Sequence, residues 1–154
     1  MNNNISQTKF FMKLAIEEAI KSKNRNEVPV GSIIINEKNK LISSNGNRII
    51  ELNDPTAHAE ILVLREASNK LKTTKLYGFS LFTTLEPCAM CAMAISLAGI
   101  KNLYFAAEDE KKGCVDNGIQ IYKTNSCHHK PNIFSGFYKK ESEDLLKKFF
   151  LDKR

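Results

Sequence analysis

The chain of 154 residues contains no apolar run as long as the about 18 residues that a membrane-spanning helix requires. Its first residues, MNNNISQTKF, lack the basic segment followed by an apolar segment that marks a secretory signal. No internal repeat, low-complexity tract or long linker interrupts the sequence. From these absences we expect a single domain over residues 1–154, located in the cytoplasm and not associated with a membrane.

Cysteine is also scarce, and one C-x-x-C pair, Cys88 and Cys91, has no second pair to complete it. In the reducing cytoplasm, we expect the four cysteines of the chain to be thiols, metal ligands or nucleophiles rather than disulfides. The pair is therefore half of a site whose remaining residues must be found elsewhere.

Positive charge is in excess, with a formal net charge of +6 and a pI near 9.1. This balance suits a polyanionic partner such as RNA, although charge alone does not establish one. Hydrophobic residues at 42% and charged residues at 26% are typical of a globular domain.

Hydrophobic periodicity predicts an α/β fold, a three-layer α/β/α arrangement in which helices cover both faces of a five-stranded mixed sheet. A hairpin is expected near the N-terminus, and a strand–helix–strand unit implies a right-handed crossover between parallel strands. The predicted strands are residues 28–36, 41–44, 79–85, 101–107 and 132–137, and the predicted helices are residues 8–24, 54–71, 87–99 and 141–154.

Cys88 and Cys91 are spaced so that both sulfurs lie on one side of a helix that begins at Pro87. The unpaired N–H groups and the dipole at a helix start favour thiolate over thiol. His58 lies in the expected first turn of the helix over residues 54–71 and meets the cysteines if both helices begin at the same sheet edge. One imidazole and two thiolates make three zinc ligands, with a fourth position left for water.

Glu60 follows His58 by two positions, which places its carboxylate poorly for binding the same ion but well for hydrogen-bonding a water molecule on it. Zinc lowers the pKa of bound water to ~7, so Glu60 would take a proton and return protons to a ring nitrogen and a departing amine. The pattern H-x-E…P-C-x-x-C, met here from His58 to Cys91, is the signature of zinc nucleobase deaminases.

Two structural alternatives remain open at this point. The histidine and two cysteines could form a closed zinc knuckle, or they could be a buried histidine beside inert core thiols. A closed site needs a fourth ligand, and both alternatives leave Glu60 without a role. The candidates for that ligand are Cys114, Cys127, His128 and His129.

The segments NGNRIIELNDPTAHAEILVL and LFTTLEPCAMCAMA resemble blocks of the bacterial tRNA-specific adenosine deaminases. EVPVGSIII, EDEKKG and LLKKFFLDKR are similar to three further segments of that family, so the resemblance extends from Glu27 to the C-terminus. It implies the cytidine-deaminase-like fold and one Zn²⁺ per subunit. It also implies a homodimer that binds the anticodon arm of tRNA and converts adenosine to inosine at the wobble position.

Carried over to this sequence, the resemblance implies that His58, Cys88 and Cys91 hold zinc and that Glu60 moves protons. Asn47 would contact the flipped nucleoside, with Val30 at the pocket floor. Each of these roles has a structural alternative: Asn47 could serve only in a turn, Val30 could be an ordinary core residue, and the residues implied to contact RNA could be core or solvated surface positions. The residues implied to contact RNA are Arg48, Asp109, Lys111, Lys147, Lys148, Phe149, Phe150, Lys153 and Arg154.

The chain departs from the family in three places: Met93 and Ala106 stand where the family has glycine, and the segment CHHKPNIFSGF is shortened and altered. Two other functions are compatible with the zinc site or with the excess of positive charge. One is a deaminase of a free base or nucleoside such as guanine, cytosine or cytidine. The other is a non-catalytic, zinc-stabilised RNA-binding domain.

Overall fold

The computed structural model describes residues 2–153 and shows a five-stranded sheet in the order β2-β1-β3-β4-β5. The strands are β1 (Gly31–Ile35), β2 (Leu41–Gly46), β3 (Ser80–Leu85), β4 (Asn102–Ala107) and β5 (Asn132–Ser135). The helices are α1 (Asn2–Asn24), α2 (Ala59–Leu71), α3 (Ala89–Leu97) and α4 (Lys139–Asp152), with a 3-10 turn η1 (Ile121–Lys123). Within residues 2–153, no helix combines the length and apolarity needed to cross a membrane.

The sheet is mixed, as the sequence predicts. β1 pairs antiparallel with both β2 and β3, whereas β3–β4 and β4–β5 are parallel pairs. α3 makes the crossover between β3 and β4, which confirms the predicted strand–helix–strand unit. The connection from β4 to β5 contains only the turn η1, so these two parallel strands are joined by a long loop rather than by a helix.

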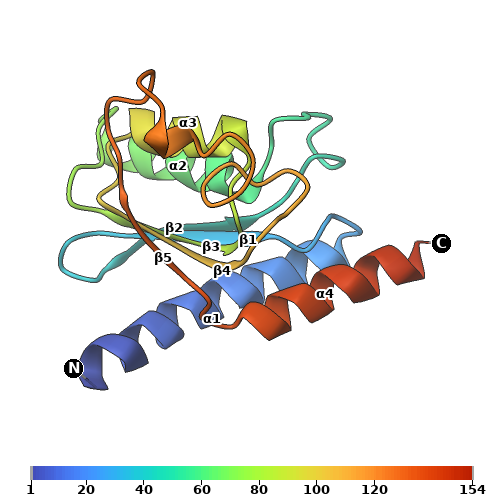
Figure 1. Ribbon diagram of the computed structural model, residues 1–154. Helices are drawn as coiled ribbons and strands as arrows, with labels where there is room; N and C mark the ends of the chain where they lie inside the picture. Colours follow the sequence, from blue (N-terminus) through green and yellow to red (C-terminus); the bar gives the residue numbers. More distant parts are fainter. Residues whose placement is uncertain (1, 154) are drawn as a thin grey trace.

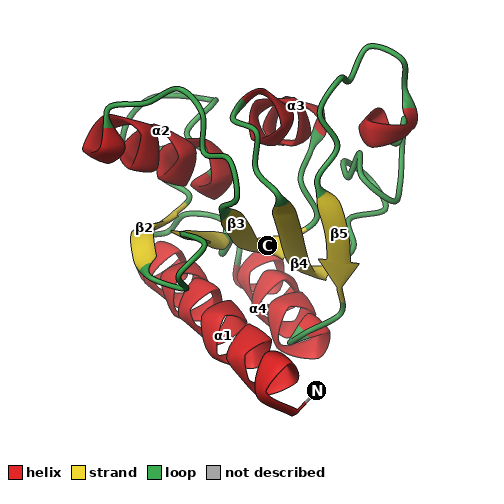
Figure 2. Cartoon of the chain, turned by 90° about the vertical axis from the view of Figure 1, so that its left-hand side faces the viewer, coloured by secondary structure: helices red, strands yellow, loops and turns green. Residues whose placement is uncertain are grey.

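Helices cover both faces of the sheet, which confirms the predicted three-layer fold. Figure 1 shows α2 and α3 on one face and α1 and α4 on the other, and Figure 2 shows the same layers from the side. Successive side chains of β3 point to opposite faces of the sheet and therefore belong to two separate core clusters. Leu81 packs with Val63 and Ile95 beneath α2 and α3, while Phe82 packs with Phe11 beneath α1. Each such fully buried side chain contributes about 1.5–3 kcal/mol.

The helix starts differ from the prediction, and the difference shapes the site. α2 begins at Ala59 rather than at residue 54, because the Asp54 side chain accepts hydrogen bonds from the Thr56 N–H and hydroxyl and forms a turn. α3 begins at Ala89 rather than at residue 87. His58 and Cys88 are therefore N-cap residues with extended backbones, not residues of the first turn.

Candidate metal centre and active site

His58, Cys88 and Cys91 converge where α2 and α3 begin. The His58 Nδ1 atom lies 3.8 Å from the Cys88 sulfur and 3.5 Å from the Cys91 sulfur. Within residues 2–153, these three side chains form the one cluster that could hold a metal ion, with their ligand atoms within 4.8 Å of one another. The expectation that both helices begin at the same edge of the sheet is confirmed.

The charges of this cluster suit a divalent cation. The hydrogen bond from the Cys91 thiol lowers the pKa of Cys88 to about 4, and the same contact raises the pKa of Cys91. The hydrogen bond with Cys88 raises the pKa of His58. The two sulfurs and the imidazole nitrogen lie close enough together to bind one dication. One imidazole and two thiolates are the three-ligand set of a catalytic zinc site, so the residues fit zinc.

The metal cluster of the described residues contains three ligands and no fourth, since Cys114, Cys127, His128 and His129 all lie outside it. His128 is exposed, and the other three make contacts elsewhere. The Cys127 thiol donates to the His129 carbonyl and contacts the Ser96 hydroxyl. The His129 Nε2 atom lies 2.6 Å from the Ile100 carbonyl oxygen. The Cys114 thiol donates to the Lys112 carbonyl oxygen, 3.6 Å away.

Glu60 lies buried beside the cluster, with 4% of its surface exposed. The Thr83 hydroxyl donates a hydrogen bond of 2.7 Å to Glu60 Oε1 and does not contact the other carboxyl oxygen, Oε2. Burial raises the pKa of Glu60, and hydrogen bonds from Cys91 and Thr83 oppose that rise in part. A carboxyl group whose pKa is raised toward neutrality is suited to proton transfer at the adjacent metal centre.

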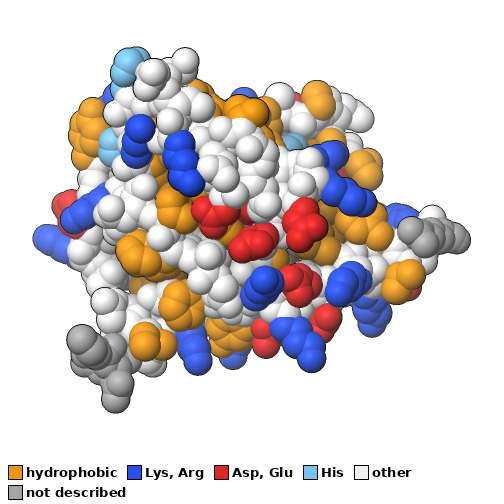
Figure 3. All heavy atoms as spheres, viewed as in Figure 1, with side chains coloured by type: hydrophobic (Ala, Val, Ile, Leu, Met, Phe, Trp, Pro, Cys, Tyr) orange, Lys and Arg blue, Asp and Glu red, His pale blue; other side chains and the backbone are white. Residues whose placement is uncertain are grey.

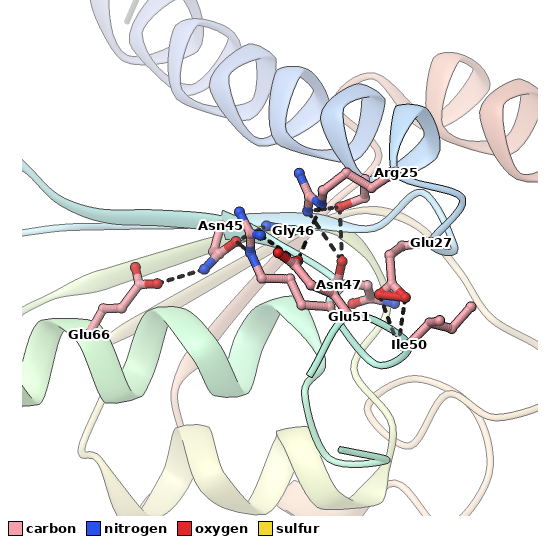
Figure 4. Close-up of polar contacts among 10 residues, drawn as sticks. Arg25, Glu27, Asn45, Gly46, Asn47, Ile50, Glu51 and Glu66 are labelled. Carbon is pink, nitrogen blue, oxygen red and sulfur yellow. Dashed lines mark hydrogen bonds and ion pairs between the residues drawn. The ribbon is translucent and has the colours of Figure 1, made fainter. Parts of the chain in front are cut away.

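Asn47 is buried and forms hydrogen bonds with three other segments of the chain, of which Figure 4 shows the contact with Arg25. Its Oδ1 atom accepts from the Ala59 N–H at the start of α2 over 2.8 Å, and its own N–H donates to the Val30 carbonyl. Its carbonyl oxygen accepts from Arg25 Nη2 over 3.3 Å. The Ala59 N–H thus fixes the orientation of the Asn47 amide. The amide NH₂ group of Asn47 has no acceptor among the described residues. Val30 is buried, and its place at the floor of a substrate pocket stays a prediction.

Arg48 is hydrogen-bonded within the protein, to Asn45 and Glu51. Its Nε atom donates to Asn45 Oδ1 over 2.7 Å, and its Nη1 atom pairs with Glu51 Oε2. The structure thus gives Arg48 an internal role in ordering the loop that follows β2, and its contact with phosphate stays a prediction.

Asp109 and Lys111 lie in the loop over residues 108–118, which follows β4. Asp109 Oδ1 accepts from the Lys111 N–H over 3.1 Å, and the Lys111 side chain is exposed. The loop is hydrogen-bonded to Glu86, a buried carboxylate that no sequence pattern indicated. Burial raises the pKa of Glu86, but hydrogen bonds from Asn117, Asp109 and Val115 lower it more, so the net pKa lies below its usual value.

The C-terminal helix presents one aromatic ring inward and one outward. Phe149 is 8% exposed and Lys153 lies over its ring, whereas Phe150 is 52% exposed. Lys147 and Lys148 are exposed on the same helix, and Arg154 lies outside the described residues. On the face seen in Figure 3, lysine and arginine side chains alternate with acidic ones and form no single basic patch.

The two residues that replace glycines of the family fit within the core. Met93 is partly buried and packs against the cluster beneath α2 and α3, and Ala106 is buried beneath α1.

Comparison with known proteins agrees with this geometry. Residues 5–107 match the cytidine and deoxycytidylate deaminase zinc-binding region. The tRNA-specific adenosine deaminase of Agrobacterium fabrum is 46% identical over 144 residues, which cover 94% of each chain. That of Rickettsia typhi is 40% identical over 140 residues, which cover 90% of this chain and 95% of the relative.

Solved structures show the same fold. A structure from a study of A-to-I editing by tRNA deaminases at the wobble position superposes with a TM-score of 0.87 at 45% identity, covering 89% of this chain and 99% of that one. A guanine deaminase from Nitrosomonas europaea superposes with a TM-score of 0.75 at 22% identity, covering 92% and 83%, a likeness that concerns the fold alone. The chain therefore belongs to the zinc-dependent deaminases of the cytidine-deaminase-like fold, and within them to the family of tRNA-specific adenosine deaminases.

Proposed function

We propose that this protein converts adenosine to inosine at the wobble position of tRNA by hydrolytic deamination, with ammonia as the second product. The observation that carries the proposal is the buried Glu60 carboxyl group beside the cluster of His58, Cys88 and Cys91. A structural zinc site has no use for a buried carboxyl group at that point. The tRNA substrate is supported by relatives of 46% and 40% identity that are tRNA-specific adenosine deaminases.

In this mechanism, His58 Nδ1 and the sulfurs of Cys88 and Cys91 would hold zinc, which would supply an activated water molecule as the nucleophile. Thr83 holds Glu60 Oε1, so Oε2 accepts the proton of the attacking water. Glu60 then delivers protons to the adenine ring nitrogen and to the departing amine, which leaves as ammonia. Water provides the oxygen of inosine, so the reaction is balanced without a further reactant.

The nucleoside must leave the base stack to reach a recessed site. Asn47 orients the flipped base through its amide NH₂ group, because its amide oxygen is already occupied by Ala59. Val30 closes the pocket behind it. Contacts with the rest of the anticodon arm fall to Asp109 and Lys111 in the 108–118 loop.

Further RNA contacts are proposed on α4. Figure 1 shows the C-terminal end of this helix at the same end of the molecule as the loop that precedes α2. Since Phe149 packs inward, the exposed Phe150 is the better candidate for stacking on a base. Lys147 and Lys148 would follow the phosphate backbone.

The proposal includes a homodimer, one deaminase domain over residues 1–154, and a cytoplasmic location, where tRNA is available. Met90, Leu97 and Ile119 are exposed hydrophobic residues on or near α3 that a second copy of the chain would cover. Light scattering coupled to gel filtration tests the dimer, and a monomer at micromolar concentration would contradict it.

The experiment that tests the function offers the zinc-loaded protein a tRNA transcript with a wobble adenosine and, in parallel, free guanine, cytosine, cytidine and adenosine. Inosine is read as A-to-G in sequencing, and ammonia release is measured for the small substrates. The matched controls are the same tRNA with a wobble guanosine and the Glu60→Gln protein. Ammonia from a free base with unchanged tRNA would contradict the proposal and support the rival deaminase.

A further inference from the structure

Glu86 lies where β3 leads into α3 and is 2% exposed, yet it takes no part in the chemistry described above. Its carboxylate is surrounded by donors from the 108–118 loop. These donors are the N–H groups of Asp109 (3.1 Å), Val115 (3.1 Å), Asp116 (3.0 Å) and Asn117 (3.0 Å) and the side-chain amide of Asn117 (2.7 Å).

The same short segment of chain joins this loop to the metal ligands. The Glu86 N–H donates to the Ala107 carbonyl over 2.8 Å, and the Cys114 N–H donates to the Pro87 carbonyl over 3.0 Å. Cys88, a metal ligand, follows directly. A Cβ atom at Gly113 would come within 2.5 Å of the Glu86 carboxylate, so the loop lies directly against it. The position of the loop relative to the metal centre therefore depends on the segment from Glu86 to Cys88.

A buried carboxylate is costly unless hydrogen bonds compensate for its lost hydration. Here the compensating donors come from a loop with no helix or strand of its own. The dependence is mutual, because the buried N–H group of Val115 and the part-buried N–H groups beside it have the Glu86 carboxylate as their acceptor. We propose that Glu86 is a positioning residue that holds the 108–118 loop in the conformation that receives tRNA. This inference rests on the proposed function, since it assigns Asp109 and Lys111 of that loop to the RNA.

The proposal predicts that loss of the Glu86 charge changes KM for tRNA and leaves kcat nearly unchanged. If loss of the charge reduces the ordered loop to a tenth of the population, the apparent affinity for tRNA falls about tenfold. Saturating tRNA selects the ordered loop again, so kcat changes little. A residue that only contributed to global stability would lower the amount of folded protein and leave KM unchanged.

The test compares the zinc-loaded protein with Glu86→Gln, which keeps the side-chain shape and removes the charge. Asn117→Ala, which removes one donor and keeps the carboxylate, is the second variant, and it decides the question if Glu86→Gln does not fold. The control is Glu37→Gln, an exposed carboxylate in the turn between β1 and β2. The measurements are zinc content, backbone amide exchange in the loop, tRNA binding, and KM and kcat on the wobble-adenosine transcript.

For Glu86→Gln we expect faster exchange at the loop amides, a KM about tenfold higher and a kcat within about threefold of wild type, with zinc content unchanged. Asn117→Ala should change KM in the same direction by a smaller factor, and Glu37→Gln should not. Unchanged exchange, unchanged KM despite faster exchange, or loss of zinc with loss of kcat would each overturn the proposal. Wild-type protein that binds tRNA without deaminating it would instead refute the proposed function. In that case, amide exchange in the loop and the affinity for tRNA would still test the role of Glu86.

Discussion

Thr83→Val isolates the hydrogen bond that supports the proposed proton carrier. Thr83 is fully buried, and its hydroxyl donates over 2.7 Å to Glu60 Oε1. Valine has nearly the same shape, so the substitution removes the donor and leaves the packing almost unchanged. A hydrogen bond to a charged group contributes about 1.5–3 kcal/mol. If that stabilisation is present in the transition state, kcat falls by about 10- to 150-fold.

The same substitution shifts the pH dependence in a defined direction. Because the Thr83 hydrogen bond opposes the rise that burial causes in the pKa of Glu60, its loss raises that pKa further. The ionised base is then populated only at higher pH, and the acid limb of the pH–rate profile moves upward. Single-turnover tRNA deamination across pH measures both effects, and Thr83→Ser, which keeps the hydroxyl, is the control. Equal rates and profiles for the two variants would refute the role of this hydrogen bond.

Three further outcomes are expected. Glu60→Gln lowers kcat by about 100- to 10,000-fold while zinc content, measured by elemental analysis, stays at the wild-type level. A chelator abolishes activity and makes Cys88 reactive toward a thiol reagent, and added zinc reverses both changes; activity that survives complete zinc removal would contradict the mechanism. Phe149→Ala lowers the free energy of unfolding by about 3–5 kcal/mol, measured with denaturant. Phe150→Ala changes it by less than about 0.5 kcal/mol and weakens tRNA binding instead.

The fold was accessible from sequence because its elements have strong local patterns. The β-branched run at β1 and the run around Leu81 and Phe82 in β3 are typical of strands that are buried on both faces of the sheet. The helix starts were less accessible. Asp54 and Thr56 form a local turn that keeps residues 54–58 out of α2, and a helix-compatible pattern does not reveal such side-chain competition.

The metal ligands could also be predicted from a local pattern, because the spacing of Cys88 and Cys91 brings both sulfurs to one side of the start of a helix. Thr83, Glu86 and Arg25 were missed because their partners lie far along the chain. Thr83 contacts Glu60, Glu86 contacts the 108–118 loop, and Arg25 contacts Asn47. Nothing local to these residues distinguishes them from other polar residues near the ends of helices and strands.

The fold alone does not determine the substrate, because a guanine deaminase shares it at 22% identity. In this chain two loops, residues 47–58 and 108–118, each contact a buried carboxylate that lies between two elements of the fold. Glu27, 2% exposed, accepts from the Ile50 N–H over 2.7 Å, and Glu86 accepts from the 108–118 loop. Substitutions at these two carboxylates would therefore change which substrate reaches the centre before they change the chemistry performed there.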